Sequence, residues 1–148
     1  MPISDNFIVL NRLFTAQSII YAMPDEKKIA AFAASAIKLI PGVKFCSIYL
    51  IETDEFYGDE FEGEWHRERL KDVRTYEGKK SNIVKIELNT TDYAFGEAYI
   101  ACDDLETIKI FESPLANFIS IASLNLENVR QRKIMDTFNR SLQSKIEE

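Results

Sequence analysis

The chain has 148 residues, of which 46% are hydrophobic, and this is enough for one domain with a substantial core but too few for two. Its formal net charge of -6 disfavours nucleic acid and anionic membrane surfaces as partners, because binding to phosphate requires an excess of Lys and Arg. The apolar stretches are interrupted by charge well before about 18 residues, and the amino terminus lacks the basic and apolar regions of a signal peptide, so we expect a cytoplasmic protein without membrane insertion.

Two helices are predicted before the first strand. Over residues 5–22 the apolar side chains recur at helical spacing on two nearly opposite faces, and we expect one face to cover a sheet while the other contacts a second helix. The two sets are Phe7, Leu10, Phe14, Tyr21 and Val9, Leu13, Ala16, Ile20. A second helix is predicted to begin around Asp25, with acid in its first turn, and to end at Pro41-Gly42.

Strands are predicted in the middle of the chain. Residues 43–52 are β-rich, and both faces of this strand carry side chains suited to burial. Residues 83–88 and 94–101 also alternate, and the turn residues between them predict a β-hairpin. In the second hairpin strand, Gly96, Ala98 and Ile100 share a face small enough for a helix to approach closely. Helices stacked on one side of an antiparallel sheet make an α+β, two-layer domain.

The segment from Thr53 to Lys80 has a poorer pattern, acidic at first and mainly basic afterwards. We expect a short strand around Phe56 to Trp65, followed by a loop or a short helix. A loop of this length on a small scaffold is either functional or disordered.

The last helix is the longest predicted element. Ser113 is a favoured N-cap, Pro114 fits the first helical position, and no later Gly or Pro interrupts the pattern. Such a helix would be about 54 Å long, against a diameter of about 35 Å for a compact domain of this size. We therefore expect a domain at residues 1–128 and a helical extension at 129–148, a signalling helix or coiled-coil linker. A downstream signalling domain in a longer chain is the expected continuation.

The predicted last helix has more than one apolar side. One stripe consists of Leu115, Phe118, Ile119, Ala122, Leu126 and Val129, and Ile121 and Leu124 add apolar surface on another side. Further on, Met135, Phe138 and Leu142 follow the a/d spacing of a coiled coil, with Asn128, Gln131 and Lys145 as polar members of the same seam. The alternative is an amphipathic end that docks on the chain's own first helix.

Several short segments, taken in order, follow the pattern of a known family. They are residues 43–50, residues 87–88 with 93–100, Phe111 with Ser113-Pro114, and the closing Phe118-Ile119, Ala122 and Leu126-Glu127-Asn128. In this order the chain resembles a GAF domain, the sensory module of histidine kinases and related signalling proteins, over residues 5–130. The resemblance implies a central antiparallel sheet with the N- and C-terminal helices packed on one face.

The resemblance also implies where a ligand would bind. In this family a ligand, where there is one, lies on the sheet face away from the terminal helices, beneath the crossover, so Trp65 and parts of 66–80 would form a lid. The candidate ligand-binding residues are Phe45, Ser47, Tyr49, Trp65, Lys85, Glu97 and Tyr99. An aromatic floor with a few polar groups suits a small ligand, but the same aromatic side chains can instead fill a closed core.

Chemistry known from other members of the family is not found in this sequence. The Asn-Lys-Phe-Asp-Glu set of cyclic-nucleotide-binding members is missing, and neither Cys46 nor Cys102 has the neighbouring histidine of many pigment-binding members. The single histidine, His66, has neighbours typical of a solvated loop, so no metal or haem ligation is expected and the cofactor is unknown. We expect both cysteines to be reduced, buried thiols.

Three functional hypotheses follow. The leading one is a sensory module that binds an unidentified small molecule and relays the signal through its last helix to an output domain such as a histidine kinase, as a homodimer. The second is a ligand-free dimerisation or scaffold module. The third, an enzyme such as a methionine sulfoxide reductase, requires reactive thiols and is disfavoured, so no catalytic residue is assigned. The candidate dimer-helix residues are Val9, Leu13, Ile20, Ile121, Leu124, Met135, Phe138 and Leu142.

Overall fold

The computed structural model describes residues 3–59, 82–102, 106 and 109–147. Within these residues the elements are α1 (Ile3–Tyr21), α2 (Glu26–Ile37), β1 (Val43–Leu50), β2 (Glu55–Gly58), β3 (Asn82–Asn89), β4 (Ala94–Cys102) and α6 (Glu112–Glu147). The described strands form one sheet in the order β2-β1-β4-β3, and every neighbouring pair is antiparallel. The predicted strands at 43–52, 83–88 and 94–101 and their hairpin are confirmed, with β1 ending two residues earlier than expected. Of the strand expected around Phe56 to Trp65, the structure has β2, which ends at Gly58, and residues 60–65 lie outside the described residues.

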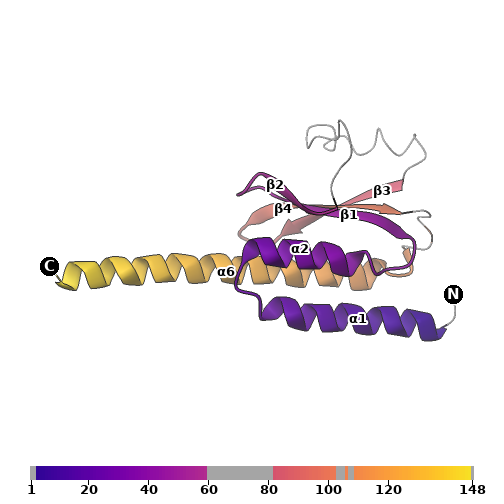
Figure 1. The fold of residues 1–148 in the computed structure, drawn as a ribbon, viewed down its shortest axis with the longest axis horizontal. Coiled ribbons are helices and arrows are strands. Elements are labelled where there is room, and N and C mark those ends of the chain that lie inside the picture. The colour runs from indigo at the N-terminus through magenta and orange to yellow at the C-terminus, as the bar shows by residue number, and fades with distance from the viewer. Residues whose placement is uncertain (1–2, 60–81, 103–105, 107–108, 148) are drawn as a thin grey trace.

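The helices lie on one side of the sheet (Figure 1). α2 and α6 pack directly against the strands, and α1 packs on α2 and α6 from the outside. This arrangement confirms the α+β prediction. The expectation that α1 itself covers the sheet is wrong: its buried face, with Val9, Leu13 and Ile20, contacts the other helices, and its second apolar face, with Phe7 and Phe14, is exposed.

α2 is suited to the space between the sheet and α1. Asp25 caps its start, because the side-chain oxygen accepts a hydrogen bond from the Lys27 backbone N–H at 3.0 Å. The helix buries mainly small side chains, among them Ala33 and Ala34, which allow neighbouring backbones to approach closely. α2 therefore positions β1 and β2 without a bulky layer in between.

The alternation along β1 and β4 fixes the two faces of the sheet. Ile48 pairs with Ala98 and Cys46 with Ile100, and all four side chains are buried on the face toward the helices. Gly96 has a different role from the one expected. A Cβ atom at this position would lie 1.7 Å from the backbone oxygen of Tyr49, so it is the neighbouring strand, and not a helix, that requires glycine here.

α6 has 36 residues and begins one residue earlier than predicted. The Phe111 carbonyl accepts the first bond, from the Leu115 N–H at 2.8 Å, so Ser113 is not the cap and Pro114 lies within the first turn, where its missing N–H is tolerated. The predicted apolar stripe from Leu115 to Val129 is buried, whereas residues 131–146 are all exposed. The helix thus leaves the domain at Arg130 and projects well beyond it (Figure 1).

Candidate functional site

The sheet face away from the helices brings together six of the seven residues predicted to bind a ligand. Tyr49 pairs with Glu97, Ser47 with Tyr99, and Lys85 with Tyr99 from the other side. Phe45 occupies the next position of β1 on the same face. The seventh residue, Trp65, and the predicted lid lie outside the described residues, as does the end of the strand expected to reach it.

Aromatic side chains form the centre of this face. The rings of Tyr49 and Phe56 lie 5.1 Å apart between centroids, and those of Phe56 and Tyr99 lie 6.3 Å apart, both in tilted arrangements. Tyr49 and Tyr99 are buried, and the Tyr49 hydroxyl donates a hydrogen bond to the Asp54 carboxylate. Sequence reasoning missed Phe56 as part of the site, although its register with Tyr49 places it on the same face.

Polar groups are embedded among these rings. The Ser47 side chain is 0% exposed, and its hydroxyl has no hydrogen-bond partner among the residues that the structure describes. Glu97 is half-buried, with one carboxylate oxygen shielded from solvent, and Lys85 on the neighbouring strand is exposed. Buried polar atoms are nearly always paired, so the Ser47 hydroxyl is an exception on this face that calls for an explanation.

One edge of the face is fixed by Asp59, directly after β2. Its carboxylate accepts a hydrogen bond from the Cys46 backbone N–H at 3.2 Å and pairs with the Lys38 ammonium at 2.9 Å. The Cys46 side chain points to the opposite, helix-facing side. Burial raises the pKa of the Cys46 thiol to about 12, the charge of Asp59 adds to this shift, and Lys38 opposes it. Such a thiol stays protonated at neutral pH, which does not favour the thiol-enzyme hypothesis.

The predicted dimer residues fall into two groups. Val9, Leu13 and Ile20 are buried in the chain's own core, so their side chains are not available to a second copy of this structure. α1 has two apolar faces, and the helical period alone does not indicate which one turns inward. The remaining members lie on α6: Ile121 is partly buried, and Leu124, Met135, Phe138 and Leu142 are exposed.

Comparison with known proteins identifies the fold. No family model matches the sequence, and no curated protein matches it. Among solved structures, the GAF domain of the potassium sensor histidine kinase KdpD from Escherichia coli matches with a TM-score of 0.61 and 13% identity, covering 84% of this chain and 96% of that one. A protein from Burkholderia vietnamiensis described as a GAF sensor matches with a TM-score of 0.59 and 11% identity, covering 89% of this chain and 96% of that one.

The chain therefore has a GAF-like fold, as the sequence resemblance predicted. At these identities the likeness concerns the fold, and function must be argued from the site. Within the described residues, no helix is both long and apolar enough to cross a bilayer. Over the same residues, no three His, Cys, Asp or Glu side chains gather closely enough to hold a metal ion.

Proposed function

We propose that the chain is a sensory module that binds a small molecule on the outer face of its sheet and relays occupancy through α6 to an output domain such as a histidine kinase. The observation that carries the proposal is the path of α6 (Figure 1). One helix packs against the sheet with its first half and projects from the domain with its second, so a shift at the sheet is transmitted along a continuous rigid element.

The outer face supports a small organic ligand with polar groups. It offers aromatic rings for apolar contact, the Ser47 hydroxyl as donor and acceptor, and the charges of Glu97 and Lys85 on neighbouring strands. The KdpD and Burkholderia structures support a sensory role by analogy of fold only.

Native mass spectrometry of freshly purified protein tests ligand binding. We expect a retained mass beyond that of the polypeptide, reduced in the Glu97→Gln variant. Glu112→Gln is the control, because Glu112 is exposed at the start of α6, on the other side of the sheet from Glu97. Bare polypeptide in every preparation, or equal retention in both variants, would contradict a site at Glu97.

The second candidate, a ligand-free dimerisation module, is favoured by one observation. Tyr49 and Tyr99 are buried and packed on Phe56, so part of this face is already filled by the protein's own side chains. Bare polypeptide in the mass spectrum, combined with a dimer, would support this second function.

Dimerisation through α6 is part of both proposals. The positions that continue the seam of Met135, Phe138 and Leu142 at alternating spacings of three and four are Ile121, Leu124, Asn128, Gln131 and Lys145, all partly or fully exposed. The end of α1 borders the seam, since Tyr21 lines a hollow of about 370 Å³ with Asn128 and Met135. A parallel homodimer would bury this surface.

Sedimentation of two single variants tests the dimer. Leu142→Glu places a charge in the seam and is expected to yield monomers, whereas Ser144→Glu adds the same charge two residues away, outside the seam, and is expected to leave the dimer intact. A monomeric parent protein at high concentration would overturn the proposal.

A further inference from the structure

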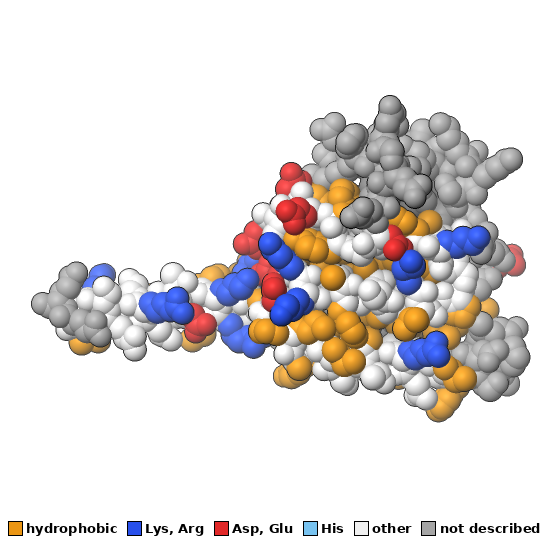
Figure 2. Space-filling view, in the orientation of Figure 1, with side chains coloured by type: hydrophobic (Ala, Val, Ile, Leu, Met, Phe, Trp, Pro, Cys, Tyr) orange, Lys and Arg blue, Asp and Glu red, His pale blue; other side chains and the backbone are white. Residues whose placement is uncertain are grey.

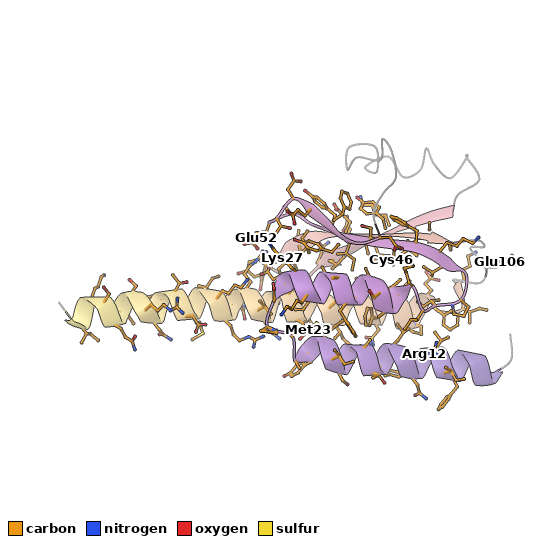
Figure 3. All side chains as sticks on the ribbon, in the orientation of Figure 1. Arg12, Met23, Lys27, Cys46, Glu52 and Glu106 are labelled. Atoms are coloured by element: carbon orange, nitrogen blue, oxygen red, sulfur yellow. The ribbon has the colours of Figure 1, made fainter. Side chains whose placement is uncertain are left out.

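Four parts of the chain meet around Arg130, where α6 leaves the domain. Val129, one residue earlier, is 2% exposed, and every residue from 131 to 146 is exposed, so Arg130 is the last side chain of α6 that the domain holds. Figure 2 shows acidic and basic side chains gathered at this point. In Figure 3, Glu52 lies near the N-terminal end of α2, on the side of the domain from which α6 projects.

The guanidinium of Arg130, on α6, has partners from the other three parts. It pairs with the Glu52 carboxylate after β1 and lies 3.6 Å from a carboxylate oxygen of Glu26, the first residue of α2. Its central carbon lies 4.7 Å from the ring centre of Phe95 and 5.8 Å from that of Tyr93, at the β3–β4 turn. Arg130 therefore joins the end of the buried part of α6, called here the root of α6, to three other parts of the domain.

The two carboxyls in this cluster are unequal. The Glu26 side chain is 8% exposed, whereas the Glu52 side chain is 60% exposed. Burial raises the pKa of Glu26, and its hydrogen bond to Glu52 and the charge of that residue add to the shift, against smaller opposing effects of Arg130 and Lys133. For Glu52, burial acts upward, but the hydrogen bond with Glu26 and the two cations outweigh it and lower the pKa.

The raised pKa of Glu26 and the lowered pKa of Glu52 define one favoured protonation state of the pair. Between the lowered pKa of Glu52 and the raised pKa of Glu26, the pair holds one proton: Glu26 donates a hydrogen bond to the Glu52 carboxylate, which also pairs with Arg130. Above this interval, ionised Glu26 loses that hydrogen bond and repels Glu52. Its attraction to Arg130 and Lys133 offsets this only in part, because the pKa of Glu26 is raised overall. Below this interval, Arg130 and Lys133 face two neutral acids.

We propose that Arg130, Glu26 and Glu52 form a latch that fixes the root of α6 to the domain while the two carboxyls share one proton, and that loosens when this proton is lost or a second one binds. A hollow of about 620 Å³ lies between the latch and the projecting part of α6. Its lining residues are Glu26, Glu52, Arg130, Lys133, Ile134, Thr137, Phe138 and Ser141, so the latch side chains border open space on this side. The importance of the latch for signalling rests on the proposed role of α6 as the output helix, but its pH dependence follows from the cluster alone.

Amide hydrogen exchange at several pH values, expressed as protection factors, tests the latch. In the parent protein, α6 amides at 124–133 are expected to be best protected at intermediate pH and to lose protection by about fivefold or more on either side, while amides at 115–121 stay constant. In Glu26→Gln the side chain always donates its hydrogen bond, so the loss on the high-pH side is expected to disappear.

Two arginine variants separate the latch from a general effect of charge. Arg130→Met keeps the apolar stem but removes the cation, and it is expected to lower protection at 124–133 at every pH. Arg132→Met is the matched control on the exposed side of the same helix and is expected to change nothing. Identical pH profiles in the parent and Glu26→Gln would overturn the proposal. Because no small molecule is involved, this result is distinguishable from a failure of ligand binding.

Discussion

The two faces of the sheet differ in what their buried residues contribute. Ser47 and Ile48 are neighbours on β1, both 0% exposed, and they point to opposite faces. Ile48 lies in an aliphatic core closed by α2 and α6, whereas Ser47 lies among tyrosines with an unsatisfied hydroxyl, within the described part of the chain. The buried side chains of the helix-facing side therefore contribute to the stability of the fold. The outer side keeps a buried hydroxyl that makes no hydrogen bond within the described residues, and this distinguishes it from the helix-facing side.

The largest expected effect comes from Gly96, where β4 approaches β1 too closely for any side chain. In Gly96→Ala the added Cβ would meet the Tyr49 backbone oxygen at 1.7 Å, so the strands must separate and both faces are disturbed. We expect a loss of about 4 kcal/mol or more in the free energy of unfolding, or no folded protein. Urea denaturation measures it, with Ala94→Ser at an exposed position of the same strand as control. A variant as stable as its parent would show that the strands are not this close.

The helix-facing side is tested next, by Ile48→Ala. Removing a fully buried aliphatic side chain from this core is expected to cost about 3 kcal/mol, because it combines lost burial with a cavity between the sheet and the helices. Ile48→Val serves as control, with an expected cost of about 1 kcal/mol. Retention of ligand, measured on the folded fraction, should remain unchanged in both. A loss of ligand retention in Ile48→Ala but not in Ile48→Val would contradict the separation of roles between the two faces.

Periodicity was sufficient to predict the faces, because alternation along residues 43–50 and 94–101 directly determines which side chains share a side. It was insufficient for α1, whose two apolar faces satisfy the helical period equally well, so Val9 and Leu13 were assigned to a dimer instead of the core. The Arg130 cluster joins positions 26, 52 and 130. Contacts between residues so far apart in the sequence leave no periodic pattern from which they could be predicted. Phe56 was missed for a related reason, since β2 is only four residues long.

The smallest expected effect on stability is the most informative one for function. Ser47→Ala removes a buried hydroxyl that has no partner within the described residues, so no hydrogen bond is lost. The free energy of unfolding is therefore expected to change by no more than about 0.5 kcal/mol. If this hydroxyl contacts a ligand, the same variant should retain less of it in native mass spectrometry, although Ser47 and Ile48 are equally buried. A stability loss approaching that of Ile48→Ala would mean that Ser47 is a packing residue, and the outer face would then be a second core.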